Sequence, residues 1–216
     1  MIRKIYKEHY FEYGEKELRH LQERDDVLGA AIRRIGMIQR KVNPNTFSSL
    51  MESIVSQQIS SKAAATVCQK LGKLCGADSL IADRIHALNI EEIQSCGMSM
   101  RKAGYIKNIA EAAITGAIDF EALPTKSDAE IIKMLTAIKG IGLWTVEMLL
   151  IFSLKRPDVV SYGDLAIRRS MMNLYEIENL TREQFLQHTK QYSPYGSIAS
   201  FYLWELSVRP KNDIGE

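Results

Sequence analysis

The sequence lacks the features that mark a secreted or membrane protein. It has only three cysteines, Cys68, Cys75 and Cys96, an odd number whose spacing fits neither a disulfide framework nor a zinc site. No run of about 18 apolar residues occurs, and the first residues contain no apolar segment typical of a signal peptide. We therefore expect a soluble protein with no membrane span, located in a reducing cytoplasm.

Strand patterns and linkers are also nearly absent. The longest β-like run, DVVSY at residues 158–162, is only as long as a loop, and no segment is rich in proline, glycine and serine. Helix signals recur instead. Three capping boxes, each of which pairs a capping side chain with a Glu or Gln three residues later, precede apolar periodic runs. They are Asn89 with Glu92, Ser127 with Glu130, and Thr181 with Gln184.

Two serines add further helix starts. Ser60 opens SKAAATVCQKLGKLC, and Ser99 opens MRKAGYIKNIAEAAI, in which Ala103, Ile106, Ala110, Ala113 and Ile114 follow helical spacing. We predict an all-α protein of about nine or ten helices, folded as one domain over residues 1–216 from two packed lobes. The segment 118–128 is the best candidate for the crossing between lobes. Residues 1–14 form a tail that is either mobile or packed on the C-terminal helices.

Charge alone does not indicate a partner. The net charge of +2 is small, and the four histidines show no metal-ligand spacing. Between residues 133 and 169, however, six basic residues stand against three acidic ones. Such a cluster is most often a solvated surface, and it favours nucleic acid only if another feature does.

That feature is LTAIKGIGLWTVEMLLIF, residues 135–152, where Gly140 and Gly142 interrupt an apolar helical pattern. Ser127 starts one helix before the glycines, and a second helix starts directly after Gly142, so the hairpin spans 127–154. So short a turn needs positive φ or close backbone approach, which glycine permits. The N–H groups that begin the second helix then form an anion site. An αα-hairpin that merely packs is the alternative.

The sequence after the hairpin makes the interpretation more specific. KRPDVVSYGDLAIRRSM places Asp164 at the start of a further helix, with Arg168 and Arg169 one turn in. Hairpin and aspartate together resemble the helix-hairpin-helix DNA glycosylase superfamily, and most of all its alkylation-repair branch, 3-methyladenine DNA glycosylase II. Segments 51–67, 102–112 and 194–210 resemble the same branch, so the resemblance covers about residues 25–210. It implies two helical lobes with an active-site cleft between them.

The resemblance implies a catalytic role for Asp164. Cleavage of a C1′–N glycosidic bond develops positive charge on the sugar, which a carboxylate stabilises while it orients the attacking water. The alternative is that Asp164 only caps its helix. Bifunctional relatives carry a Schiff-base lysine two residues after the second glycine of the hairpin, where this chain has Trp144. The expected enzyme is therefore monofunctional and leaves an abasic site.

A flipped base needs a pocket and a replacement in the stack. By resemblance, Trp144, Met148, Trp204 and Leu165 line the pocket, although Trp204 could simply be core. Leu165 and Gly163 differ from the aromatic and acidic residues common in bacterial relatives, which leaves base selectivity open. Gln58 matches the wedge that fills the vacated stack. The other expected DNA contacts are Lys139, Gly140, Ile141, Gly142, Thr145 and Arg168.

No cofactor is required by this interpretation. An iron–sulfur cluster needs four closely spaced cysteines near the C-terminus, and none follows Cys96. The family does imply a sodium or potassium ion held by backbone carbonyls of the hairpin, at Thr136, Ile138 and Ile141.

We therefore expect a monomeric, monofunctional DNA glycosylase that flips and excises alkylated purines of the 3-methyladenine and 7-methylguanine type. Its partner is double-stranded DNA with damaged bases, in the bacterial nucleoid or, in a eukaryote, the nucleus. Two alternatives stay open. One is a non-catalytic DNA-binding module that keeps the hairpin, and the other is a glycosylase for oxidised or deaminated purines.

Overall fold

The computed structural model describes residues 9–76 and 80–209. Within these ranges the chain forms twelve α-helices, one 3-10 helix and one two-stranded sheet, which confirms the predicted all-α class. The expected nine or ten helices were too few. Helices α5 (Ala82–Ala87) and α6 (Ile90–Ser95) have six residues each, too short for a full apolar repeat. None of the helices in the described ranges is long and apolar enough to cross a membrane.

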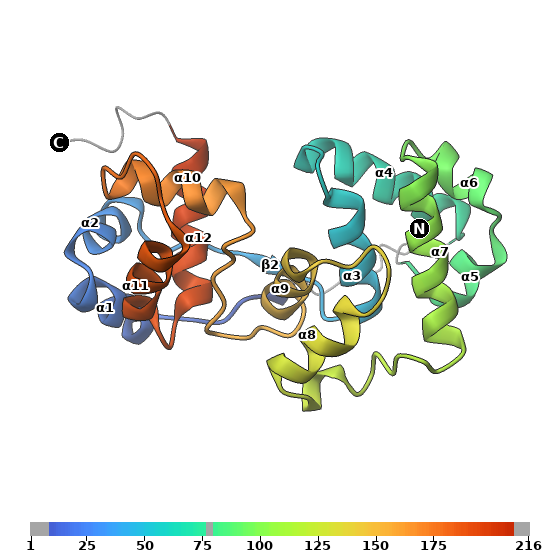
Figure 1. Cartoon of the computed structure of the whole chain (residues 1–216), viewed down its shortest axis with the longest axis horizontal. Helices are drawn as coiled ribbons and strands as arrows, with labels where there is room; N and C mark the ends of the chain where they lie inside the picture. The colour runs from blue at the N-terminus through green and yellow to red at the C-terminus, as the bar shows by residue number, and fades with distance from the viewer. Residues whose placement is uncertain (1–8, 77–79, 210–216) are drawn as a thin grey trace, which may run out of the picture. The chain divides into compact units, whose positions relative to one another are not determined.

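The chain divides into two compact units. Unit 1 combines the chain up to Val42 with the chain from Lys155 onward, and unit 2 is Asn43–Leu154. In Figure 1 the blue and the orange-to-red helices belong to unit 1, and the cyan-to-yellow helices belong to unit 2.

The predicted crossing at 118–128 is therefore wrong, because this segment lies inside unit 2. The Thr46 hydroxyl donates to the Phe120 carbonyl at 3.0 Å, and the Phe120 ring meets Phe47 edge-on with centroids 5.4 Å apart. Leu123 is fully buried. These long-range contacts hold the segment in the core of unit 2, and no local pattern in the sequence predicts them.

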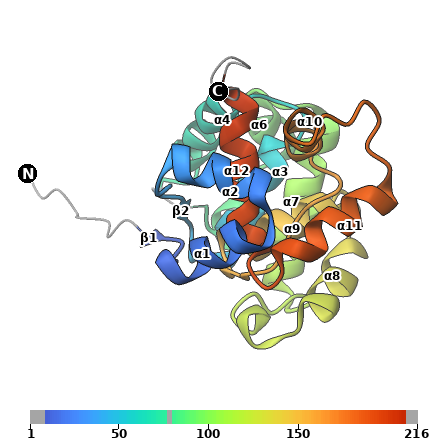
Figure 2. The ribbon, with the colours of Figure 1, turned by 90° about the vertical axis from the view of Figure 1, so that its left-hand side faces the viewer.

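Unit 1 is built around its last helix. α12 presents small and apolar residues on all sides, and its first eight residues are all buried. α2, α10 and α11 pack around it (Figure 2). The elements of this unit are β1 (His9–Tyr10), α1 (Glu15–Arg24), α2 (Asp26–Ile35), β2 (Lys41–Val42), α10 (Leu165–Leu174), α11 (Arg182–Tyr192) and α12 (Gly196–Val208).

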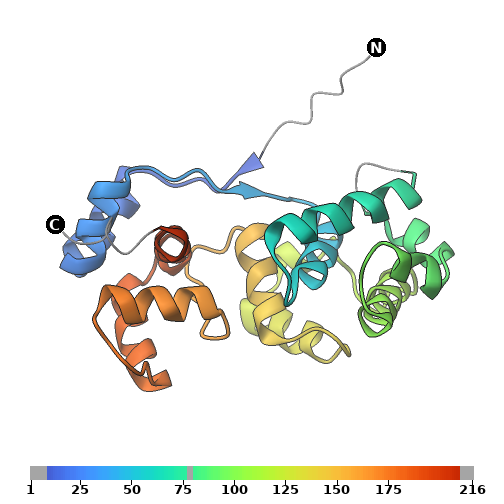
Figure 3. The ribbon, with the colours of Figure 1, turned by 90° about the horizontal axis from the view of Figure 1, so that it is seen from above.

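The described part of the N-terminal segment packs on this helix. β1 pairs antiparallel with β2, with His9 opposite Val42 (Figure 3). Phe11 is buried and meets the Phe201 ring of α12 edge-on at 5.0 Å. The rest of the predicted tail, residues 1–8, lies outside the described residues.

Unit 2 is built around α9, which is also apolar on all sides. α9 packs against α3 and α8, while α7 packs against α3, α5 and α6. Besides α5 and α6, its elements are α3 (Thr46–Ser56), α4 (Ser61–Leu74), α7 (Met100–Ile114), the 3-10 helix η1 (Leu123–Thr125), α8 (Asp128–Thr136) and α9 (Leu143–Phe152).

The predicted helix starts are confirmed. All three capping boxes form, and the hydroxyls of Ser60 and Ser99 accept the N–H groups of Ala63 and Lys102. Two of the five apolar residues at helical spacing in α7 are not buried, since Ala113 is half-buried and Ile114 is 42% exposed. Ile109, which is fully buried, completes that apolar face instead.

Candidate functional site

Asp164 begins α10 as its N-cap. One carboxylate oxygen, Oδ1, accepts the N–H of Ile167 at 3.0 Å, and the Asp164 carbonyl accepts the N–H of Arg168 at 3.1 Å. The residue is only 8% exposed. A carboxylate has two oxygens with about four acceptor positions, so the cap uses a fraction of its capacity. Capping and a chemical role are therefore compatible in one side chain.

The loop before Asp164 is fixed to the first turn of α12. Asp158 Oδ1 accepts the Gly196 N–H at 3.0 Å, and the Ser197 hydroxyl accepts the Val159 N–H at 3.0 Å. A Cβ on Gly196 would lie 2.7 Å from Val160 Cγ2, so only glycine allows this close approach. The loop is thereby held in one conformation, and it carries Asp164 at its end.

The other end of α10 is held as well. Tyr175, its C-cap, donates its hydroxyl to Asp25 Oδ2 at 2.6 Å and lies 2.6 Å from the hydroxyl of Tyr192. Burial raises the pKa of the Tyr175 hydroxyl, which keeps it a neutral donor. Both ends of the helix that positions Asp164 are thus anchored in unit 1.

In the hairpin of unit 2 the two glycines have different roles. Gly140 has a φ of +105°, and a Cβ there would lie 2.2 Å from Cγ of Tyr105. Gly142 is the N-cap of α9, with φ −93° and ψ 169°, and a Cβ there would meet nothing within 4 Å. Positive φ and close packing therefore apply to Gly140 alone, which corrects the expectation for both glycines.

Gly142 leaves the start of α9 open. It provides no side-chain acceptor, and the first N–H groups of a helix have no carbonyl four residues earlier in the helix to bond to. With the helix dipole, such donors attract an anion, and the bare surface at Gly142 allows it to approach. Ile141 before it is buried, and Lys139 is exposed.

Gln57 joins the hairpin to the end of α3. Its Nε2 donates to the Thr145 hydroxyl at 2.9 Å and to the Gly140 carbonyl at 3.3 Å. Lys102 Nζ donates to the carbonyls of Gln57 and Val55, at 2.8 and 3.0 Å. Burial lowers the pKa of the Lys102 ammonium, while these carbonyls compensate for part of its lost hydration. Sequence reasoning did not single out Gln57, and the doubled glutamine was its only signal.

Thr145 belongs to this support. It was expected to contact DNA, but it is only 1% exposed, and its N–H donates to the Gly142 carbonyl at 3.0 Å. We therefore assign its side chain to holding the turn from inside.

Gln58, the expected wedge, follows directly. It is exposed and has a φ of 60°, a left-handed conformation that is uncommon for a residue other than glycine. Such strain often accompanies function. With Gln57 and Tyr105 it borders a cavity of about 260 Å³.

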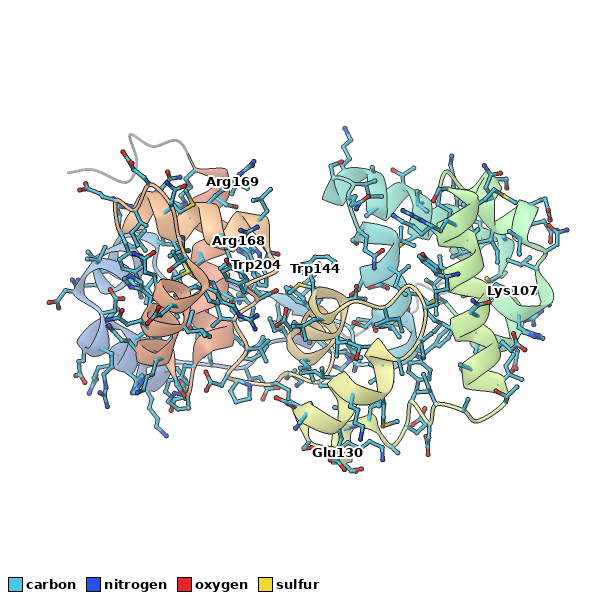
Figure 4. All side chains as sticks on the ribbon, in the orientation of Figure 1. Lys107, Glu130, Trp144, Arg168, Arg169 and Trp204 are labelled. Carbon is cyan, nitrogen blue, oxygen red and sulfur yellow. The ribbon has the colours of Figure 1, made fainter. Side chains whose placement is uncertain are left out.

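The expected pocket residues are divided between the units. In unit 2, Trp144 is half-buried in the first turn of α9, and Met148 is buried one turn later. In unit 1, Leu165 is 50% exposed, and Trp204 is half-buried beside Phe201, with ring centroids 6.3 Å apart. Figure 4 labels both tryptophans. Neither indole is a fully buried core residue, so each has surface available to a ligand.

The carbonyls expected to hold a cation are of a suitable kind. Thr136 ends α8, where carbonyls lack a partner within the helix, and the Ile138 carbonyl accepts one bond, from the Ile141 N–H at 3.1 Å. A carbonyl has a second lone pair, and hard oxygen ligands suit a sodium or potassium ion. The cation remains a prediction.

An all-α chain with a glycine hairpin, followed by a buried aspartate at the start of a helix, has the architecture of a helix-hairpin-helix DNA repair protein. Residues 51–194 match the HhH-GPD superfamily of base excision DNA repair proteins, and the chain belongs to this family. The predicted family is thus confirmed.

Individual relatives agree with this assignment. The chain is 38% identical to DNA-3-methyladenine glycosylase 1 of Schizosaccharomyces pombe over 181 residues, which are 76% of this chain and 77% of the relative. It is similar to the crystal structure of a DNA-3-methyladenine glycosidase from Bacillus halodurans, with 34% identity, a TM-score of 0.78 and 93% of each chain covered. It is also similar to the S. pombe 3-methyladenine DNA glycosylase in complex with abasic DNA, with 32% identity, a TM-score of 0.83, and 91% and 98% covered.

Proposed function

We propose that this protein is a monofunctional DNA glycosylase that flips alkylated purines out of duplex DNA and excises them, leaving an abasic site. The observation that carries the proposal is Asp164, a nearly buried carboxylate held at the start of α10, in a chain whose relatives are named DNA-3-methyladenine glycosylases. A DNA-binding module has no use for a carboxylate that repels phosphate.

Asp164 acts on the sugar. As the C1′–N bond lengthens, positive charge develops on the deoxyribose, and a fixed carboxylate stabilises this charge more strongly when partly shielded from water. The same carboxylate orients the attacking water or takes its proton. Alkylation gives the purine a positive charge, which makes it a better leaving group, so the protein need not protonate the base.

Trp144 makes the reaction monofunctional. It stands two residues after Gly142, where bifunctional relatives carry the amine that forms a Schiff base. Without that amine, no covalent adduct leads to cleavage of the strand. Borohydride should therefore fail to trap a protein–DNA adduct during base release, and efficient trapping would contradict this assignment.

DNA is held by both units. The N–H groups that begin α9 and the exposed Lys139 bind backbone phosphates, contacts that position the protein without reading bases. Gln58 fills the stack that the flipped base leaves. In unit 2 the Trp144 indole, with Met148, offers the base an electron-rich ring that favours a cationic purine. In unit 1 Trp204 and Leu165 offer a ring and an apolar side chain of the same kind. A sodium or potassium ion at the hairpin carbonyls would strengthen the phosphate grip.

We further propose that the protein acts as a monomer wherever the genome is kept, in the bacterial nucleoid or the nucleus. The decisive experiment offers duplexes that contain 3-methyladenine, 7-methylguanine, hypoxanthine or 8-oxoguanine and measures the bases released. We expect release of the two methylated purines. Release of only hypoxanthine or 8-oxoguanine would show that the protein acts on a different class of damaged purine. Release of no base would favour the alternative of a non-catalytic DNA-binding module.

A further inference from the structure

Tyr162, two residues before Asp164, lies beside two guanidinium groups. The Cζ atom of Arg168, on α10, is 5.2 Å from the ring centroid, and the Cζ atom of Arg182, the first residue of α11, is 5.9 Å from it. Figure 4 labels Arg168 on α10. The ring itself is fixed by Phe185, a buried residue that meets it edge-on at 5.1 Å. One immobilised ring thus holds two cations from two helices.

Neither arginine of this cluster forms an ion pair with a described residue. Within residues 9–76 and 80–209, neither Arg168 nor Arg182 has a carboxylate within 4.0 Å, whereas Arg40 and Arg209 both pair with Glu205. Arg168 Nε is also buried without a hydrogen-bond acceptor. An unsatisfied buried donor is unfavourable, and both guanidinium groups lie within 6 Å of one ring centroid. A bound anion could supply the missing acceptor and would be attracted by both charges.

We propose that Tyr162, Arg168 and Arg182 form a phosphodiester-binding site on unit 1. Arginine forks bind phosphate oxygens in pairs, and the planar ring keeps both forks oriented before the strand arrives. Arg168 was already expected to contact DNA from the family resemblance; the site adds Arg182 as its second ligand and Tyr162 as its platform. The inference rests on the proposed function, because the phosphate is that of the DNA substrate.

The proposed phosphate site lies close to Asp164 along the chain, so it can position the DNA strand beside this carboxylate. Tyr162 precedes Asp164 by two residues and Arg168 follows it by four, so the ring, the carboxylate and one arginine lie within seven residues of chain. A phosphate held by this segment fixes the strand relative to the carboxylate. The negative charge of Asp164 would otherwise repel that strand, and the two arginines offset the repulsion.

The test is the salt dependence of DNA binding by Arg182→Gln. For wild type and variant, the association constant for an undamaged duplex is measured from about 50 to 200 mM salt. Loss of one phosphate contact should lower the slope of log K against log salt by about 0.9 and weaken binding about tenfold at low salt. A duplex with 7-methylguanine should show the same loss, because phosphate contacts carry no base information.

Three variants sharpen this result. Arg19→Gln, at an exposed position on α1, removes the same charge elsewhere in unit 1 and should leave the slope unchanged. Tyr162→Phe keeps the ring and should bind like wild type, whereas Tyr162→Leu removes the platform and should weaken binding. Thermal unfolding establishes that each variant is folded.

Equal slopes for wild type and Arg182→Gln, or equal reductions in Arg182→Gln and Arg19→Gln, would overturn the site. The proposed function is tested separately by base release from the wild-type protein. If wild type releases no base but Arg182→Gln still lowers the slope, the phosphate site stands and the glycosylase assignment fails.

Discussion

The N-termini of α9 and α10 differ in whether a side chain caps the first N–H groups of the helix. α9 begins at Gly142, which offers its first-turn N–H groups no side-chain acceptor, while α10 begins at Asp164, whose carboxylate caps its own helix. An uncapped start attracts an external anion, and a start capped by aspartate supplies a negative charge. One helix start is thus suited to hold the DNA backbone, and the other to stabilise a cation that forms on the sugar.

The two starts are also supported differently. Behind α9, side chains hold the turn: Gln57 bonds to Gly140 and Thr145, and the Tyr105 ring packs on Gly140. Before α10, the loop backbone is bonded to the first turn of α12 through Ser197, and Asp158 accepts from Gly196. Substitutions at the two starts should therefore affect different measurable quantities.

Asp164→Asn should have the largest effect, and on chemistry alone. Asparagine caps a helix as well as aspartate, so the free energy of unfolding should change by less than about 1 kcal/mol. Release of 7-methylguanine should fall by at least about 10²–10³-fold, because the carboxylate charge is lost. DNA binding should be retained or improved, since repulsion of phosphate disappears. Single-turnover base release and binding titrations measure both.

Asp119→Asn is the control, because the exposed Asp119 likewise accepts backbone N–H groups through Oδ1, from Glu121 at 3.0 Å and Ala122 at 3.1 Å. It should excise at the wild-type rate. Near-normal excision by Asp164→Asn would instead mean that Asp164 is only a cap.

Gly140→Ala should have the next largest effect, on stability. Its φ of +105° is unfavourable for alanine, and the new Cβ would overlap the Tyr105 ring. Each effect typically amounts to about 1–3 kcal/mol, so we expect a loss of about 2–6 kcal/mol in urea unfolding. Gly116→Ala separates the two, because Gly116 has a φ of +72° but nothing within 4 Å. Equal losses in the two variants would mean that Tyr105 moves aside freely.

Gly142→Val should instead weaken binding with little change in stability. Its φ of −93° suits any residue, and its surroundings are open. The new side chain would block the phosphate, and loss of a hydrogen bond to a charged group weakens binding by about ten- to a hundredfold. Damaged and undamaged duplexes should lose affinity equally. Gly104→Val adds the same side chain at another open position, on α7, as a control. Normal binding and excision by Gly142→Val would place the phosphate contact elsewhere.

Gln57→Met should have the smallest effect. It keeps the side-chain length but removes both hydrogen bonds to the hairpin, so stability should fall by about 1–2 kcal/mol, with a severalfold slower excision. Gln94→Met, at an exposed position on α6, should change neither. Combination with Thr145→Val tests the direct contact, since the two losses should then not add. Full additivity would show that Gln57 and Thr145 act independently.

The sequence by itself determined the helical class, most helix starts, the hairpin and the position of Asp164. A capping box joins residues three apart, and an apolar repeat is local, so both can be recognised in the amino-acid sequence. The placement of Asp164 as the N-cap of α10 was predicted for the same reason, because the cap bonds to Ile167 only three residues later.

Only the tertiary structure decided which glycine needs its conformation, where the chain crosses between units, and which side chains support the site. Gln57 meets Thr145 across 88 residues, and the Thr46 hydroxyl meets the Phe120 carbonyl across 74. The Tyr105 ring packs on Gly140, and Arg182 reaches the ring of Tyr162 from another helix. Such pairs produce no periodic pattern in the sequence, because they depend on how whole helices pack. Helix packing is set by the summed burial of many apolar side chains rather than by any short motif.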